Sequence, residues 1–509
     1  MGTEEKIGRL QAHQKKLRAY KHAMNLLNYD GSTLMPSGGA DYLSDTLEIL
    51  SGEEYSLRTA PETGELLREL SQVKDQLDFQ TRREVEELLR EQERLLRVPK
   101  EEVMAMESAA SRATACWQTA RKNDDFQAFA PHLEKLIEMK KRYAGYIAPE
   151  KPAYDVLMDD YERGMNQEDM DAFFGELKAA LAPLIGKLKD AEQPDVSFME
   201  GPFDVQRQKA LSQAVMEIMG LDRSRCVLGE SAHPFTTEFS KFDVRITTRY
   251  AEDDMASNLY SVIHEGGHAM YELSISDGLA HSVLGEGAST AIHESQSRLW
   301  ENYIGRSRAF CGLLLPRLKE LFPAQFAGVT EEGLYRAVNM ARPSLIRTEA
   351  DELTYPMHIL IRYELEKAIF SGDLPVSDLP GEWNRLYREY LGVQVPDDAR
   401  GILQDIHWAG GDFGYFPSYA LGTAYAAQIF EALKADVVVE RCCETGDFAP
   451  VRQWLTEKVY AHGMLYAPKE LIRRICGRDF DPACYTRYLR EKFGSLYDMD
   501  AGRGKREGR

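Results

Sequence analysis

The sequence has no long apolar run and no cysteine pattern of the kind that holds a metal or a disulfide framework. No stretch reaches the roughly 18 consecutive apolar residues that a membrane-spanning helix needs. The seven cysteines include no C-x-x-C pair, and their odd number does not indicate a disulfide framework. The first residues, MGTEEKIGRL, lack the apolar core of a secretory signal. These absences predict a cytoplasmic protein with reduced thiols and no membrane partner.

Positive charge is also scarce. The chain has 62 Lys and Arg residues and 82 Asp and Glu residues, which gives a formal net charge of −20. Binding to a phosphate backbone needs a concentrated basic patch, so nucleic acid is not expected as a partner. The one basic cluster, Arg503, Lys505, Arg506 and Arg509, is typical of a solvated terminus.

Helix formers dominate the N-terminal part of the chain. Between Lys6 and Ala148 apolar residues recur three or four positions apart, as in Leu66, Leu70 and Val73. This spacing predicts a series of long amphipathic helices that serve as scaffold or lid. Loops rich in Pro, Gly and Asp are expected at 148–153, 192–204 and 372–380.

Strand-like alternation of apolar and polar residues is clear once, at Phe242–Thr248. The predicted fold is therefore mainly α with one small β-sheet. We expect a single domain over residues 1–509, with a helical lid or scaffold region at 1–150, a catalytic region at 200–430 and a helical C-terminal region at 430–509. The strand could be the sheet edge on which a peptide binds as an additional strand, or an ordinary structural strand.

The most specific pattern is H-E-x-x-H at His264, Glu265 and His268, within a predicted helix over 257–273. Histidines four residues apart project from one helix face, which suits two ligands of one zinc ion. Glu265 would lie beside the metal, where its carboxylate could take a proton from a metal-activated water. The motif predicts a zinc metallopeptidase.

The alternative is a helix with two ordinary histidines. Gly266 and Gly267 weaken it, because each glycine inside a helix costs about 1 kcal/mol relative to alanine and needs a packing or access reason.

Catalytic zinc takes three protein ligands, so a third His, Asp or Glu is required. His293 and Glu294, in a predicted helix over 288–303, are the nearest candidates. We favour Glu294 as the ligand, and His293 as a group that either orients a ligand or binds substrate. Cobalt or manganese could replace zinc in such a site.

Six short blocks occur in one order along the chain. They are His233-Pro234-Phe235, Asp243-x-Arg245-x-Thr247, His264-Glu265-x-x-His268, His293-Glu294-Ser295-Gln296, Ile346-Arg347-x-x-Ala350-Asp351 and Gly401-x-x-Gln404-Asp405-x-His407-Trp408. Together they resemble the Taq-type (thermostable carboxypeptidase 1) zinc metallocarboxypeptidases, which are similar in fold to neurolysin and angiotensin-converting enzyme.

The resemblance implies a two-lobed helical fold with a deep groove and a homodimeric assembly. It implies one zinc ion per subunit, bound by His264, His268 and Glu294, with Glu265 as the general base. The expected activity is removal of single C-terminal amino acids from peptides, with broad specificity.

An enzyme that acts at a C-terminus needs a cation to pair with the free carboxylate of its substrate. Arg347 is the preferred anchor and Arg245 the second candidate. The alternative for each is a structural ion pair, with Asp351 and Asp243 respectively.

Several further residues have more than one candidate role. His233 is held extended by the following proline and could contact substrate or be structural. His407 could donate to the oxyanion of the transition state, or a tyrosine in 415–425 could do so, with Tyr419 as the candidate among the tyrosines. Asp405 could orient a histidine.

Trp408 is expected in the core or the wall of the groove.

Two other functions are compatible with the scaffold. An oligoendopeptidase or dipeptidase would share the zinc site and lack carboxylate recognition. A non-catalytic peptide-binding relative would have lost the base or a ligand, whereas Glu265 and all three predicted ligands are present.

Overall fold

The computed structural model describes residues 2–499, so the basic cluster of the C-terminal tail lies outside the described residues. The chain folds into two compact units, each built from three separate segments. Unit 1 contains the residues up to Leu96, Val196–Tyr335 and Ile429–Asp479, and unit 2 contains Arg97–Asp195, Arg336–Gln428 and the residues from Phe480 on.

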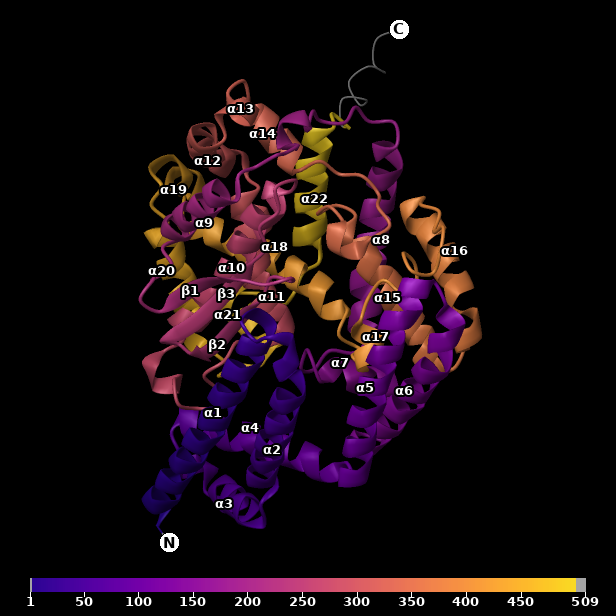
Figure 1. Ribbon diagram of the computed structural model, residues 1–509. Helices are drawn as coiled ribbons and strands as arrows, with labels where there is room; N and C mark the ends of the chain where they lie inside the picture. Colours follow the sequence, from indigo (N-terminus) through magenta and orange to yellow (C-terminus); the bar gives the residue numbers. More distant parts are fainter. Residues whose placement is uncertain (1, 500–509) are drawn as a thin grey trace. The chain divides into compact units, whose positions relative to one another are not determined.

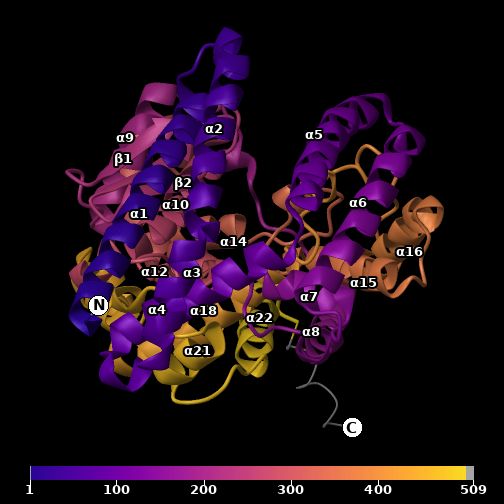
Figure 2. The same cartoon turned by 90° about the horizontal axis from the view of Figure 1, so that it is seen from below.

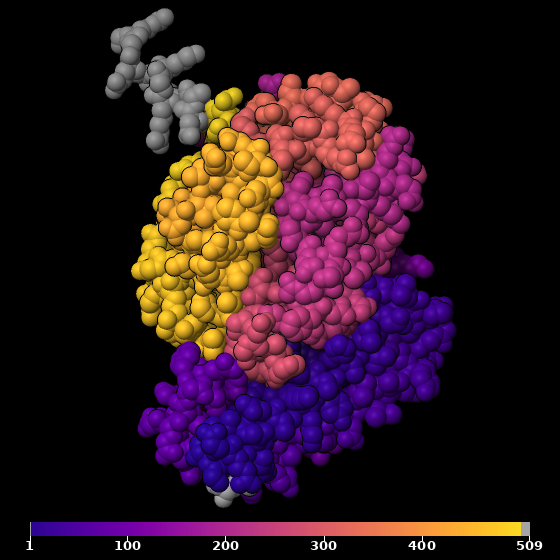
Figure 3. Space-filling view, turned by 90° about the vertical axis from the view of Figure 1, so that its left-hand side faces the viewer, coloured from indigo at the N-terminus to yellow at the C-terminus, as the bar shows by residue number. Residues whose placement is uncertain are grey.

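Unit 1 combines long helices with the small sheet. Its helices are α1 (Thr3–Thr33), α2 (Ala40–Thr59), α3 (Pro61–Gln72), α4 (Phe79–Arg97), α9 (Val205–Met219), α10 (Met255–Ser274), α11 (Thr290–Arg298), α12 (Arg308–Leu321), α13 (Pro323–Phe326), α19 (Val439–Thr445), α20 (Ala449–Lys458) and α21 (Pro468–Cys476). Helices α1 and α2 lie side by side (Figures 1 and 2). The N-terminal, middle and C-terminal segments of this unit are seen together on one face (Figure 3).

The sheet of unit 1 has three strands in the order β1-β3-β2. Strand β3 (Asp243–Thr248) pairs parallel with β1 (Cys226–Glu230) and antiparallel with β2 (Thr236–Ser240). The predicted strand is therefore confirmed, and of its two open roles the sheet edge is excluded, because β3 has a neighbour on both sides. Val244 and Ile246 on β3 are fully buried, as the alternation indicated, but Phe242 is 55% exposed and Thr247 is also fully buried.

Helix α10 carries the H-E-x-x-H motif and confirms the helix predicted over 257–273. It begins after Asp254, whose side chain accepts a hydrogen bond from the backbone N–H of Ser257. A Cβ on Gly267 would lie 2.7 Å from the carbonyl oxygen of Gln296, so this glycine lets the backbone of α11 approach. At Gly266 a Cβ would instead meet a flexible methionine side chain. Close backbone packing is thus the reason for a glycine at Gly267.

Helix α11 confirms the helical stretch predicted over 288–303. Ser289 caps its start by accepting from the N–H of Ile292. After Arg298 the helix widens into η5 (Leu299–Gly305), a buried π-helical segment, and such segments are frequent at functional sites.

Unit 2 is helical. Its helices are α5 (Lys100–Asn123), α6 (Phe126–Ile147), α7 (Ala153–Asp159), α8 (Gln167–Leu188), α15 (Tyr355–Ser371), α16 (Leu379–Leu391), α17 (His407–Gly410) and α22 (Ala483–Leu496). Helices α14 (Glu331–Val338) and α18 (Pro417–Asp436) contribute residues to both units. Figure 2 shows α5 and α6 as a helical hairpin.

The three predicted loops lie largely between helices. The first follows α6 and ends where α7 begins, at Ala153; α8 and α9 flank 192–204; and 372–380 follows α15 and overlaps the first two residues of α16. The mainly α fold with one small sheet is confirmed. Short 3-10 turns complete it: η1 (Ser37–Gly39), η2 (Lys74–Gln76), η3 (Ser197–Met199), η4 (Asp277–Leu279), η6 (Arg347–Glu349), η7 (Val376–Asp378) and η8 (Tyr460–His462). All seven cysteines are free. Within residues 2–499 no helix combines the length and apolar character needed to cross a membrane.

Candidate metal and catalytic site

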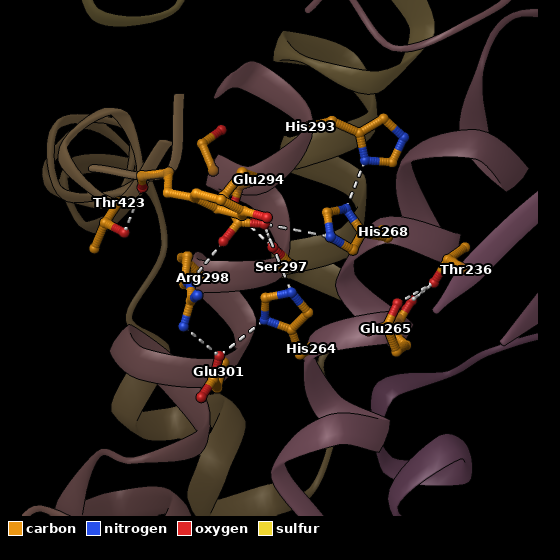
Figure 4. Close-up of polar contacts among 12 residues, drawn as sticks. Thr236, His264, Glu265, His268, His293, Glu294, Ser297, Arg298, Glu301 and Thr423 are labelled. Atoms are coloured by element: carbon orange, nitrogen blue, oxygen red, sulfur yellow. Dashed lines mark hydrogen bonds and ion pairs between the residues drawn. The ribbon is translucent and has the colours of Figure 1, made fainter. Parts of the chain in front are cut away.

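Unit 1 brings the three predicted metal ligands together. His264 and His268 come from α10 and Glu294 from α11, and their ligand atoms lie within 4.8 Å of one another. The Glu294 Oε2 atom is 3.6 Å from His264 Nε2 and 3.5 Å from His268 Nε2 (Figure 4). Two imidazoles and one carboxylate are a donor set of catalytic zinc sites, so these residues fit a divalent metal.

The Nδ1 atom of each of the two histidine ligands also has a partner. His264 Nδ1 lies 2.9 Å from Glu301 Oε2, and His268 Nδ1 lies 2.6 Å from His293 Nδ1. Because Nδ1 is engaged in both rings, Nε2 is the atom that each ring offers to a metal.

His293 lies between a candidate ligand and a buried carboxylate. Its Nε2 is 2.8 Å from Glu272 Oε1, while its Nδ1 meets His268. Of the two roles that the sequence left open, these contacts favour orientation of His268 over contact with substrate.

The charge on Glu294 is set by its neighbours. Arg298 Nε donates to Glu294 Oε1 at 2.7 Å, and Ser297 Oγ donates to Oε2 at 3.1 Å. Burial alone would raise the pKa of Glu294, but Arg298 and His264 hold that pKa well below its usual range. The carboxylate is therefore ionised, as a metal ligand must be.

The pKa of His268 is lowered to about 3, mainly by burial and further by the neighbouring His293 and His264. The ring is therefore neutral near pH 7, which is the form that can bind a metal.

Glu265 points toward the sheet. The Thr236 Oγ1 hydroxyl, on β2, donates to Glu265 Oε2 at 2.6 Å (Figure 4). The carboxylate is 7% exposed, and burial raises the pKa of Glu265 although His264 and Thr236 oppose this. A raised pKa suits a group that takes a proton and later returns it.

Four residues around these side chains were not predicted from the sequence: Thr236, Glu272, Arg298 and Glu301. Two of them carried a signal. Glu272 follows His268, and Arg298 follows Glu294, by four residues, the spacing that places side chains on one helix face.

Arg347 lies in unit 2 and is 6% exposed. Its Nε and Nη2 lie 3.0 Å and 2.9 Å from Asp405 Oδ1, and Arg362 Nε donates to Asp405 Oδ2 at 2.7 Å. Burial would raise the pKa of Asp405, but the two arginines keep it low. The predicted role of Asp405 in orienting a histidine is therefore wrong, because its side chain pairs with two guanidinium groups.

The alternative ion pair of Arg347 with Asp351 is also wrong. Asp351 accepts hydrogen bonds from the backbone N–H groups of Arg342 and Thr354 and from the Thr354 hydroxyl. It shapes the start of α15.

His407 and Tyr419 lie together in unit 2, with His407 Nε2 3.3 Å from the Tyr419 hydroxyl. Trp408 is buried and donates from Nε1 to Glu366 Oε1 at 2.7 Å, so of the two places expected for it, the core and the groove wall, it lies in the core.

Arg245 and His233 lie in unit 1. Arg245 makes a two-point ion pair with Asp243, at 3.0 Å and 2.9 Å, and its guanidinium lies 4.5 Å from the centre of the Phe239 ring. The structural ion pair that the sequence left open for Arg245 is thus present. His233 is exposed in the loop between β1 and β2, where its carbonyl accepts from Ser231 Oγ.

Comparison with known proteins adds independent information. Residues 9–493 match the family profile described as Carboxypeptidase Taq (M32) metallopeptidase. The chain is 40% identical over 485 residues to carboxypeptidase 1 of Bacillus subtilis (strain 168), covering 95% of this chain and 97% of that protein. It is 36% identical over 494 residues to thermostable carboxypeptidase 1 of Pyrococcus furiosus, covering 96% and 98%.

Solved structures agree. The fold is similar to an M32 carboxypeptidase from Deinococcus radiodurans R1, with a TM-score of 0.95 at 37% identity over 97% of this chain and 100% of that one. It is also similar to metallocarboxypeptidase 1 of Trypanosoma cruzi, with a TM-score of 0.92 at 33% identity over 96% and 99%.

Proposed function

The chain belongs to the carboxypeptidase Taq (M32) family of metallopeptidases and is a metallocarboxypeptidase, and from this premise we propose how its own residues perform the reaction. The family is the one that the six motifs predicted. In the proposal His264, His268 and Glu294 bind one zinc ion, and Glu265 is the general base. The observation that carries it is the convergence of these three ligand atoms within 4.8 Å, with Glu265 next to His264 in the chain.

Zinc is the favoured metal because neutral imidazole and carboxylate ligands in a three-residue site are typical of zinc peptidases. Cobalt or manganese should also bind such a donor set. When bound, the metal supplies polarisation of the scissile carbonyl and a lowered pKa of the attacking water.

Glu265 takes the proton of that water at Oε1 or Oε2 and delivers it to the leaving amine. Its burial and its hydrogen bond to Thr236 keep the carboxylate in one orientation during both transfers. General-base catalysis of this kind contributes about 10²–10⁴-fold to a rate.

Arg347 is the proposed anchor for the free C-terminal carboxylate of the substrate. Support comes from its burial and from the sharing of one carboxylate, Asp405, by two guanidinium groups. We assign substrate contacts also to His233, Arg245 and His407, and oxyanion donation to Tyr419.

Further parts of the proposal concern the molecule as a whole. We propose one carboxypeptidase domain spanning residues 1–509, a homodimer and broad specificity for peptides with a free C-terminus. A cytoplasmic location without nucleic-acid or membrane partners accords with the net charge of −20.

The test is the product profile, by mass spectrometry, from a peptide of about ten residues and from its C-terminal amide. The zinc-loaded wild type, Glu265→Gln and Arg347→Met are compared. We expect stepwise loss of single residues from the free acid alone, a loss of rate of about 10²–10⁴-fold in Glu265→Gln with unchanged zinc content, and a raised KM in Arg347→Met.

Internal cuts in both peptides would instead indicate an endopeptidase, and cleavage of a dipeptide but not of the ten-residue peptide a dipeptidase. No cleavage by fully loaded wild type would indicate a peptide-binding protein. Full activity of Glu265→Gln would exclude Glu265 as the base.

A further inference from the structure

We propose that Glu272, acting through His293, holds His268 in the one tautomer that can bind a metal through Nε2. The inference rests on the proposed metal site. Its basis is a chain of three side chains: His268 Nδ1 lies 2.6 Å from His293 Nδ1, and His293 Nε2 lies 2.8 Å from Glu272 Oε1. Glu272 is 4% exposed and does not belong to the group of three ligands.

The local structure places this chain firmly. Glu272 is one helical turn beyond His268 on α10, so both project from the same face. His293 reaches them from α11. A Cβ on Gly287 would lie 2.5 Å from Cδ2 of His293, so the absence of a side chain there makes room for the ring. The Tyr271 ring packs against His293 at 5.2 Å between centres.

Only one arrangement of protons serves both contacts and metal binding. A neutral His268 that offers the lone pair of Nε2 must carry its proton on Nδ1. That N–H donates to His293 Nδ1, which must then be the acceptor. His293 therefore carries its proton on Nε2 and donates it to the Glu272 carboxylate.

The ionised carboxylate selects this arrangement because it can only accept hydrogen bonds. If His293 changed tautomer, the lone pair of Nε2 would face the charged oxygen of Glu272, and a hydrogen bond to an ionised group would be lost. Without Glu272 the opposite arrangement becomes accessible, with His293 donating to His268 Nδ1. In that state the His268 proton is on Nε2, and the ring cannot bind the metal.

A purely structural role for Glu272 makes a different prediction. Loss of a buried contact would lower the stability of the apoprotein and leave the metal affinity of the folded fraction unchanged. Metal affinity and the geometry around the metal are therefore the discriminating measurements.

The experiment uses the full chain stripped of metal by a chelator. Zn²⁺ affinity is measured by competition with a chromophoric chelator, and the visible d–d spectrum is recorded with Co²⁺. Glu272→Met and His293→Phe should each weaken Zn²⁺ binding by about 10–100-fold and change the Co²⁺ spectrum. The control, Glu84→Met, removes another buried carboxylate of unit 1, which accepts from Gln14 and Gln80, and should keep wild-type affinity.

Conservative variants and a double variant test the mechanism. His293→Gln offers an oxygen to His268 and an amide N–H to Glu272, and should recover part of the affinity lost in His293→Phe. Glu272→Gln keeps an acceptor oxygen and should lose less than Glu272→Met. Glu272→Met combined with His293→Phe should bind no more weakly than His293→Phe alone, because Glu272 acts through His293.

Wild-type Zn²⁺ affinity and an unchanged Co²⁺ spectrum in folded Glu272→Met would overturn the inference, as would equal affinity of His293→Gln and His293→Phe. If Glu272→Met does not fold, Glu272→Gln and the two His293 variants decide. Failure of the proposed function looks different, because wild type itself would then bind no stoichiometric Zn²⁺.

Discussion

Arg298 donates through Nε to Glu294 Oε1 at 2.7 Å, on the carboxylate oxygen opposite to the one that faces the two histidines. Its Nη1 also donates to Glu301 Oε2 at 3.1 Å, and this same oxygen lies 2.9 Å from His264 Nδ1. One guanidinium group thus links the proposed carboxylate ligand to the side chain that orients a proposed histidine ligand.

Removal of this link should weaken metal binding. In Arg298→Ala we expect Zn²⁺ affinity to fall by about 10–100-fold, because Glu294 and Glu301 each lose a charged donor that helps to position them. Arg298→Lys keeps the charge but lacks the planar fork, so its affinity should lie between those of wild type and Arg298→Ala. Chelator competition measures the affinity. Arg317→Ala, which removes an exposed ion pair with Glu320 on α12, is the control, and equal affinities in the two alanine variants would contradict the prediction.

Thr236 should affect catalysis without affecting the metal. Thr236→Val keeps the shape of the side chain and removes the hydroxyl that donates to Glu265 Oε2. A hydrogen bond to a charged group is worth about 1.5–3 kcal/mol, so kcat should fall by about tenfold or more. Zn²⁺ affinity should stay within about twofold of wild type.

Thr237→Val is the matched control, because Thr237 is the next residue of β2 and lies opposite Arg245 in the sheet. Steady-state kinetics with one peptide compares the two variants. An equal loss of kcat in both variants would mean that a disturbance of β2, and not the loss of the Thr236 hydroxyl, lowers kcat.

The parts of this molecule that follow from local spacing could be predicted from the sequence. The i, i+4 spacing of His264 and His268 determines that they share a helix face, whatever the rest of the fold. Strands β1 and β2 were not predicted, because each has five residues and one contains Gly229 while the other is mostly polar. Their place is decided by pairing with β3, a long-range contact.

Partners distant in sequence were also missed. Asp351 is four residues from Arg347 and looked like its natural partner, yet the pair forms with Asp405, 58 residues away. Because such a contact depends on how η6 and the segment before α17 meet in unit 2, no local pattern indicates it.

Glu366 should make stability depend on pH. This carboxylate of α15 is fully buried and accepts from Tyr154, Trp408 and the N–H of Gly414. Burial raises the pKa of Glu366 from 4.5 to about 7. The fold therefore favours the protonated form of Glu366. Its contribution to the free energy of unfolding is complete below pH 4.5 and is lost as the pH rises toward 7.

The expected loss over that range is about 3 kcal/mol, from about 1.4 kcal/mol per pKa unit. Glu366→Gln stays uncharged at every pH and should lack this component. Urea unfolding of both proteins at several pH values between 4.5 and 8 measures their free energies of unfolding. As the pH rises, wild type should lose stability relative to Glu366→Gln. Parallel pH profiles of wild type and variant would contradict the prediction.

Gly267→Ala should disturb the metal site through the backbone. The added Cβ would lie 2.7 Å from both the carbonyl oxygen of Gln296 and Cα of Ser297, so α11, which carries Glu294, must move away from α10. Overpacking of this kind costs about 1–3 kcal/mol, more than the roughly 1 kcal/mol that alanine gains over glycine in a helix. We expect lower apoprotein stability in urea unfolding and weaker Zn²⁺ binding.

Gly266→Ala is the matched control for this change. Its Cβ would lie 2.8 Å from Cε of Met219, the end of a flexible side chain that can turn aside. Stability should therefore be unchanged or slightly increased by the better helix propensity of alanine, and Zn²⁺ affinity should remain that of wild type. If both alanine variants weaken Zn²⁺ binding equally, close approach of α11 at Gly267 is not what positions Glu294.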